Sequence, residues 1–87
     1  MNSANFVQKR DELLISFENM DDHELLIKLI DLYSSNIPSS PEIARIALHK
    51  MRLYVPTIPD ELKQKSKKWL KKHNYSESIF NGGVDTE

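Results

Sequence analysis

Hydrophobic residues recur along this chain at the spacing of an α-helix, in four segments divided by proline or serine. Phe6, Leu13, Leu14 and Phe17 stand at i, i+7, i+8 and i+11, which is one face of a helix over residues 4–18. The second segment, residues 22–33, has a broader apolar stripe. Its members are Leu25, Leu26, Ile27, Leu29, Ile30, Leu32 and Tyr33. Because a helix that is apolar around most of its circumference is normally enclosed, we expect this one at the centre of the fold.

The start of the second helix has the pattern of a capped N-terminus. Asp21 is a preferred N-cap residue, and Glu24 follows at the position that completes a capping box. Met20, just before the cap, is spaced to pack on Leu25 as a hydrophobic staple. These signals predict that the helix begins immediately after Asp21.

The third helix is predicted to follow Ser39 and Ser40, with Pro41 in its first turn, where the missing N–H of proline is not needed. Pro56 prevents the helix from continuing. Its apolar face consists of Ile43, Ile46, Ala47, Met51 and Tyr54.

A fourth helix is predicted from about Pro59 to Lys72 or His73, with Asn74 as a left-handed terminator. Thr57 and Asp60 are spaced like a second capping box. The apolar stripe of this helix is narrow and contains Leu62, Trp69 and Leu70, with Ser66 on the same side, so we expect it to dock mainly through Trp69.

These elements predict an all-α fold, a small bundle of about four helices. We expect residues 1–80 to form a single helical domain and residues 81–87 a flexible tail. The segment from Tyr75 to Phe80 has two interpretations: it covers the bundle, or it is a short docking peptide.

Composition narrows the function classes. The 87 residues include no cysteine, which excludes disulfides and thiolate metal sites. No apolar run approaches the length that spans a bilayer, so we expect a cytoplasmic protein. The histidines lack metal-ligand spacing, and no serine has the glycine context of a hydrolase nucleophile. We therefore expect a non-enzymatic protein without metal or cofactor.

Charge is distributed unevenly. Residues 1–42 carry a net charge of −5, residues 43–73 carry +7, and residues 74–87 carry −3. Such asymmetry bears on association with partners rather than on fold. Six basic side chains in the 43–73 region are the candidate partner-binding residues: Arg45, His49, Arg52, Lys67, Lys68 and Lys71.

The lysines fall on the predicted outer face of the fourth helix. Three alternatives stay open for Lys67, Lys68 and Lys71: contact with a phosphate backbone, contact with an acidic protein, or an ordinary solvated face. Against nucleic acid, no arginine or asparagine of this helix is placed to read bases.

Arg45, His49 and Arg52 form a stripe at i, i+4 and i+7, which we place on an outward face of the third helix. Arginine binds carboxylate or phosphate in a bidentate manner. The alternative is pairing within the chain, for example with Glu18 or Asp31.

This stripe resembles a pattern of histidine-phosphotransfer domains. In that family an exposed helical histidine is followed by an apolar residue two positions later and a lysine three positions later; His49, Met51 and Arg52 stand at these positions. Where the family has a small residue, four positions after the histidine, this chain has Leu53. The resemblance implies an exposed His49 that accepts a phosphoryl group.

The chain is also similar to the four-helix immunity proteins of nuclease bacteriocins. The shared features are its length, Glu24-Leu25 followed by Lys28-Leu29, Tyr54 with Pro56, and a late Trp69 followed by a tail with Phe80. The third helix of that family is very short, unlike the one expected here. The family's acidic nuclease-binding surface corresponds in part to Glu18, Asp21, Asp22, Glu24 and Asp31. This resemblance implies an inhibitor.

Together these patterns favour a non-enzymatic helical regulator or adaptor that binds a partner protein and masks or recruits it, as an inhibitor, an anti-activator or an immunity-type protein does. The alternative is a small DNA-binding transcriptional regulator that uses the basic 43–73 region. Homodimerisation stays open, since an apolar helix could be sheltered by a second copy.

Overall fold

The computed structural model describes residues 3–34, 38 and 40–78, and every regular element within them is helical. The elements are α1 (Ser3–Ser16), the 3₁₀ turn η1 (Phe17–Asn19), α2 (Asp22–Tyr33), α3 (Pro41–Arg52) and α4 (Asp60–Lys72). The predicted all-α class is confirmed.

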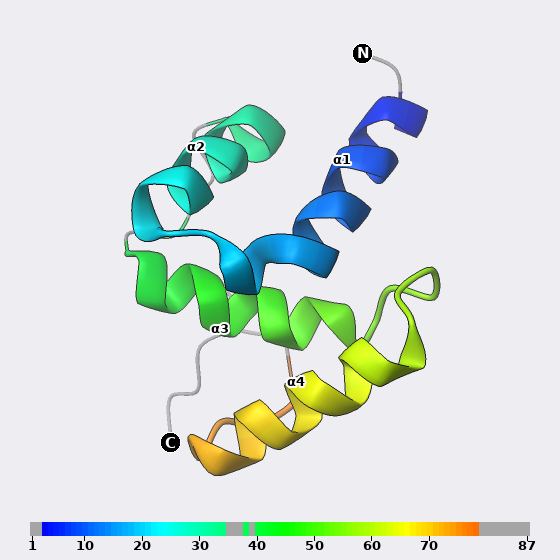
Figure 1. Cartoon of the computed structure of the whole chain (residues 1–87), viewed down its shortest axis with the longest axis vertical. Coiled ribbons are helices and arrows are strands. Elements are labelled where there is room, and N and C mark those ends of the chain that lie inside the picture. The colour runs from blue at the N-terminus through cyan, green and yellow to red at the C-terminus, as the bar shows by residue number, and fades with distance from the viewer. Residues whose placement is uncertain (1–2, 35–37, 39, 79–87) are drawn as a thin grey trace.

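The third helix, not the second, is the centre of the fold. Figure 1 shows α3 crossing the middle of the molecule, with α1 and α2 on one side and α4 on the other. α2 buries only Leu25 and Leu29, while Ile27 and Ile30 are 51% and 52% exposed. The expectation of a central second helix is therefore wrong. A chain this short has too few elements to surround a helix whose whole circumference is apolar.

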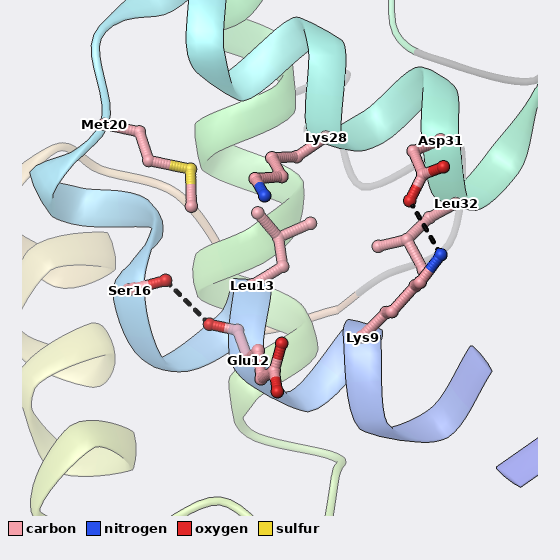
Figure 2. Close-up of a pocket in the computed structure, with 8 residues that line it drawn as sticks. All are labelled: Lys9, Glu12, Leu13, Ser16, Met20, Lys28, Asp31 and Leu32. Atoms are coloured by element: carbon pink, nitrogen blue, oxygen red, sulfur yellow. Dashed lines mark hydrogen bonds and ion pairs between the residues drawn. The ribbon is translucent and has the colours of Figure 1, made fainter. Parts of the chain in front are cut away.

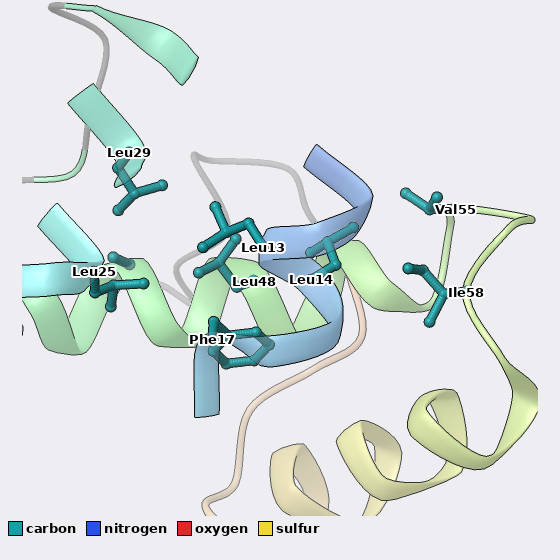
Figure 3. Packing of buried hydrophobic residues seen from close by; sticks show 9 residues of the cluster. Leu13, Leu14, Phe17, Leu25, Leu29, Leu48, Val55 and Ile58 are labelled. Carbon is teal, nitrogen blue, oxygen red and sulfur yellow. The ribbon is translucent and has the colours of Figure 1, made fainter. Parts of the chain in front are cut away.

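The hydrophobic core lies where α1, η1 and α2 meet α3. Its members come from all of these elements and from the loop before α4 (Figure 3): Leu13, Leu14, Phe17, Leu25, Leu29, Ala44, Leu48, Val55 and Ile58. The loop residues matter because the proline-rich turn after α3 folds back onto the core and sets where α4 begins.

Two predicted helix starts are confirmed. The Asp21 carboxylate accepts a hydrogen bond of 2.8 Å from the Glu24 amide, and the Ser40 hydroxyl accepts one of 3.2 Å from the Ile43 amide. Asn74 ends the last helix with a φ of 64°, as predicted. These local signals hold because each satisfies backbone groups that a helix end leaves without partners.

Two local predictions are wrong. α1 ends at Ser16, and residues expected to continue it form η1 instead. Thr57 does not take part in a capping box, since the N-cap of α4 is Pro59, without a side-chain hydrogen bond. The Thr57 hydroxyl donates a 2.7 Å hydrogen bond to the carboxylate of Asp11. A contact between distant segments thus replaces the local one.

None of the helices in the described part of the chain combines the length and the apolar composition needed to cross a bilayer. Ile79 and Phe80, and the 81–87 segment for which a flexible tail is predicted, lie outside the described residues.

Candidate functional site

The stripe on α3 faces inward. His49 is 3% exposed, Arg52 is fully buried and Arg45 is half-buried. The sequence-based placement of these three on an outward face is corrected, because α3 is covered by α1 and η1 on one side and by α4 on the other. The alternative of pairing within the chain is confirmed for Arg52, whose guanidinium lies 2.9 Å from a carboxylate oxygen of Glu18.

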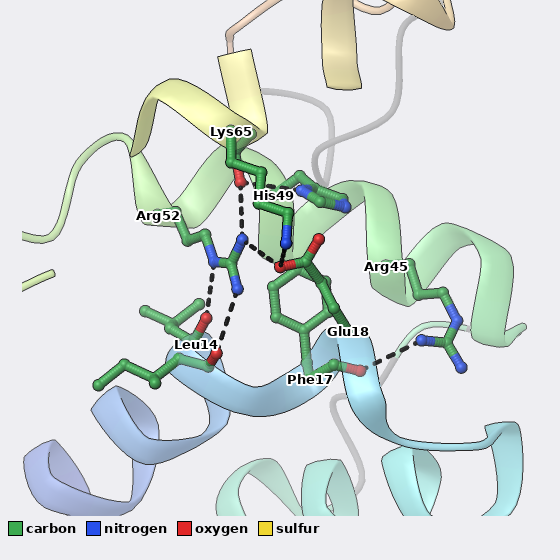
Figure 4. Close-up of polar contacts among 9 residues, drawn as sticks. Leu14, Phe17, Glu18, Arg45, His49, Arg52 and Lys65 are labelled. Atoms are coloured by element: carbon green, nitrogen blue, oxygen red, sulfur yellow. Dashed lines mark hydrogen bonds and ion pairs between the residues drawn. The ribbon is translucent and has the colours of Figure 1, made fainter. Parts of the chain in front are cut away.

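Arg52 caps the end of α1 (Figure 4). Its Nε donates to the carbonyl of Leu14 at 2.6 Å, and one Nη donates to the carbonyl of Ile15 at 3.4 Å. These carbonyls are in the last turn of α1, where intrahelical partners are missing. The guanidinium also lies over the ring of Phe17, 4.4 Å from its centroid. Arg52 therefore fixes where α1 stops.

Arg45, which lies about two helical turns before Arg52 on α3, makes a similar contact. Its guanidinium donates to the carbonyls of Phe17 and Met20 and forms an ion pair of 2.9 Å with Asp22. It thereby holds the turn between α1 and α2. The two arginines are occupied by the fold, and neither is offered to a partner in this arrangement.

Glu18 is an acidic partner shared by Arg52 and Lys65, and these residues together with His49 and Ser66 are called the Arg52 cluster. Its carboxylate lies 3.6 Å from the ammonium of Lys65 in addition to its contact with Arg52. Partial burial acts to raise the pKa of Glu18, but the hydrogen bond and charge of Arg52, with smaller effects from Lys65 and His49, hold this pKa below its ordinary value. The carboxylate therefore stays ionised and connects η1 to α3 and α4.

His49 is enclosed between two aromatic rings. Its imidazole contacts Phe17 edge to face at 4.8 Å and is stacked on Trp69 at 4.1 Å. Burial lowers the pKa of His49 from 6.5 to about 4, against the opposing effect of the Glu18 charge. His49 is therefore neutral near pH 7.

Ser66 joins the two helices through its hydroxyl. Its Oγ is 2.8 Å from Nδ1 of His49 and accepts a 3.2 Å hydrogen bond from Arg52. With a neutral imidazole we assign the tautomer that carries its proton on Nε2, so the serine donates to Nδ1. One feature of the sequence indicates this contact: a serine stands within the apolar stripe of a lysine-rich helix.

The Ser66–His49 pair has the residue types of a nucleophile and its base, yet its geometry is structural. Ser66 is fully buried, and its oxygen is also held by Arg52. A substrate could not reach it without separating α3 from α4. The burial of His49 also contradicts the exposed histidine that the phosphotransfer resemblance implies.

Unlike the buried residues of the α3 stripe, the lysines of α4 face solvent. Lys67, Lys68 and Lys71 are exposed, as predicted, and within residues 3–34, 38 and 40–78 none of their ammonium groups has an ion-pair or hydrogen-bond partner. The acidic first half offers these lysines little charge compensation, because four of its carboxylates pair with other cations. These pairs are Asp11 with Arg10, Glu18 with Arg52, Asp22 with Arg45, and Asp31 with Lys9.

These three lysines line an open groove of about 390 Å³ together with residues that follow α4. Its apolar part is mainly Tyr75, because Leu70 borders the groove but is fully buried. Its other wall is formed by residues 75–77. Sequence reasoning did not identify this wall, because Tyr75 was ambiguous between covering the bundle and docking elsewhere.

Two hydrogen bonds fix the wall of the groove. The amide of Tyr75 donates to the carbonyl of Leu70 at 2.9 Å, and the hydroxyl of Tyr54 donates to the carbonyl of Glu77 at 2.6 Å. The Tyr75 ring is nearly parallel to that of Trp69, with centroids 6.1 Å apart. The described part of the 75–80 segment thus folds back onto α4 and onto the turn that follows α3.

The described residues contain no cluster of acidic or histidine side chains that could hold a metal ion. Comparisons of the chain with protein-family models, with curated proteins and with solved structures each gave no match. The candidate functional surface is the lysine-lined groove of α4.

Proposed function

We propose that this protein is a non-enzymatic regulator or adaptor that binds an acidic segment of a partner protein in the groove between α4 and residues 75–77. One observation carries the proposal: Lys67, Lys68 and Lys71 are uncompensated within the described residues and line a groove with an apolar floor. A partner segment with carboxylates and one apolar side chain would match both features. Binding there would mask or recruit the partner without chemistry.

The composition of the groove favours protein over nucleic acid. Tyr75 offers an apolar surface in the groove that an apolar side chain of a protein segment would cover and a phosphate backbone would not. The arginines that could read base edges, Arg45 and Arg52, are held by backbone carbonyls inside the fold.

The lysines would act mainly through long-range attraction. Exposed ion pairs contribute little each, about 0.2–1 kcal/mol, so lysine charge serves encounter and orientation more than affinity. The apolar contact with Tyr75 would then supply the short-range part of binding. This division predicts a moderate, salt-sensitive association.

A double variant tests the groove. Lys68→Gln with Lys71→Gln removes two charges from it, and the control, Lys28→Gln with Lys72→Gln, removes two charges from exposed positions that do not line it. Tagged wild type and both variants are used to capture partners from host lysate, with and without nuclease. The affinity of the captured partner is then measured by calorimetry.

We expect one protein to be retained by wild type and control after nuclease treatment, and the groove variant to bind it about 2- to 30-fold more weakly. If the groove variant binds the partner as tightly as wild type does, the groove is not the binding site. Recovery that collapses with nuclease would instead establish the alternative, a DNA-binding regulator. The logarithm of the binding constant of purified protein for duplex DNA would then fall linearly with the logarithm of salt concentration, with a slope of several units.

A further inference from the structure

A second cavity lies on the other side of the molecule, between α1 and α2 (Figure 2). Its volume is about 210 Å³, which is below the range of about 300–1,000 Å³ typical of pockets for drug-sized ligands. It is lined by Lys9, Glu12, Leu13, Ser16, Met20, Lys28, Asp31 and Leu32. The cavity shares no lining residue with the groove of α4, so the two sites can bind ligands independently.

The floor of this pocket is apolar. Leu13 belongs to the core, and Met20 and Leu32 are partly buried and packed against that core. An apolar group seated on these three side chains would extend the core outward between the two helices. The hydrophobic gain scales with the area removed from water, so a branched aliphatic or thioether side chain is the favoured occupant.

The charged residues of the pocket comprise one ion pair and two exposed groups that have no ion-pair partner among the described residues. Lys9 and Asp31 form an ion pair of 3.1 Å across one end. The ammonium of Lys28, which Figure 2 shows turned in above Leu13, has no partner among the described residues. The carboxylate of Glu12 accepts only a 3.3 Å hydrogen bond from the Gln8 amide group within the same part of the chain.

Glu12 and Lys28 stand on the two helices that form the walls. Glu12 projects from α1 and Lys28 from α2, and they do not form an ion pair with each other in the described structure. The residues that line the pocket thus include one carboxylate and one ammonium beside its apolar side chains. A ligand with charges of both signs could pair with both, whereas a ligand of one charge would leave the other group unsatisfied and face like-charge repulsion.

We infer that this pocket binds a free apolar amino acid as its zwitterion. The ammonium of the ligand pairs with Glu12, its carboxylate pairs with Lys28, and its side chain seats on Leu13, Met20 and Leu32. The small cavity matches a single amino acid rather than a peptide, and a residue within a peptide lacks the two free charges. Leucine and methionine are the favoured ligands because their side chains are apolar and flexible.

The test is a titration followed through the methyl NMR signals of Leu13, Met20 and Leu32. Three probes are compared: L-leucine, isocaproate, which lacks the amine, and isoamylamine, which lacks the carboxylate. We expect saturable shifts with leucine and at least about tenfold weaker binding of each analogue, since each loses one charge-assisted hydrogen bond.

Variants of Glu12 and Lys28 test which side chain pairs with the amine of the ligand and which pairs with its carboxylate. Glu12→Gln and Lys28→Gln change exposed side chains, so folding is expected to persist, and circular dichroism checks this. Each is expected to weaken leucine binding about tenfold, while the matched control Lys72→Gln, on α4, leaves it unchanged. Glu12→Gln should also remove the preference for leucine over isocaproate, because the amine then has no carboxylate to meet.

Three results would overturn the inference: no saturable shift with leucine, an analogue that binds as tightly as leucine, or unchanged leucine binding in Lys28→Gln. None of these bears on the groove of α4, where Lys28→Gln is part of the control. The pocket and the groove can therefore fail independently.

Discussion

The imidazole of His49 on α3 is stacked on the indole of Trp69 on α4, with ring centroids 4.1 Å apart and planes inclined by 15°. Trp69 in turn contacts His73 at 4.3 Å and Tyr75 at 6.1 Å. A row of rings thus leads from the core to the wall of the groove. The stability of the α3–α4 contact and the shape of the proposed binding surface depend on the same residues.

The first prediction concerns acid. His49 has its pKa lowered to about 4 by burial, whereas in the unfolded chain it would titrate near 6.5. Between these values the unfolded state binds more protons, so the free energy of unfolding falls as pH is lowered from 6.5 to 4. The full difference corresponds to on the order of 3 kcal/mol. Urea unfolding measured across this range checks the slope.

His49→Phe keeps a ring between Phe17 and Trp69 but cannot titrate, so the pH dependence between 4 and 6.5 should flatten. His23→Gln, at an exposed position, is the control and should leave the slope unchanged. As pH falls below the ordinary glutamate value of 4.5, Glu18, whose pKa is lowered in the fold, adds a further loss of stability that ends once its folded form is protonated as well. A full slope in His49→Phe would show that another group is responsible.

The second prediction concerns Arg52. Replacing it with methionine leaves Glu18 without its main partner and the Leu14 carbonyl without its donor. Removing one member of a buried ion pair costs about 3–5 kcal/mol, a large share of the stability of so small a domain. Chemical denaturation of Arg52→Met measures this loss.

Arg52→Lys should recover little of that stability, because an ammonium cannot reproduce the planar fork that reaches Leu14, Ser66 and Glu18 together. A double variant, Arg52→Met with Glu18→Gln, should be more stable than Arg52→Met alone, since the stranded charge is removed. If Arg52→Lys is as stable as wild type, the planar geometry of the guanidinium does not contribute to stability.

The third prediction concerns the wall of the groove. Tyr54→Phe removes the 2.6 Å hydrogen bond to the Glu77 carbonyl while keeping the ring. Because Tyr54 is exposed, global stability should change by no more than about 1 kcal/mol. Local opening should increase instead, which hydrogen exchange of the amides at 75–78 would reveal. Unchanged exchange would mean that this bond does not hold the wall.

Local sequence signals predicted the helix ends well. Asp21, Ser40 and Asn74 act on backbone groups within a few residues of themselves, so their effect is visible in the sequence. Thr57 shows the limit of such reasoning. Its hydroxyl has the spacing of a cap, yet it donates to Asp11, a partner far away along the chain.

The role of α3 could not be predicted in the same way. Its pattern of Arg45, His49 and Arg52 resembles a polar outer face, and α2 is the more apolar helix. What the pattern does not contain is the position of the other helices. α4 supplies Ser66 and Trp69 to the buried His49, and the turn between α1 and α2 accepts the hydrogen bonds of Arg45. A buried polar stripe and an exposed one have the same periodicity.

For the candidate site, the exposure of the lysines followed from the sequence, because Leu62, Trp69 and Leu70 set which side of α4 faces inward. The groove did not, since it needs Tyr54 to hold residues 75–77 against α4. The pocket between α1 and α2 is likewise tertiary: Glu12 and Lys28 have no relationship until the two helices pack.

The sequence by itself determined the all-α class, the approximate helix bounds, most of the capping residues and the solvated face of α4, because these depend on periodicity and on contacts within one or two turns. Only the tertiary structure decided that α3 is central, that the Arg52 cluster is internal, and which charges stay uncompensated. The physical reason is that burial and pairing depend on neighbours from other helices, and a charge is available to a partner only when the fold has not already neutralised it.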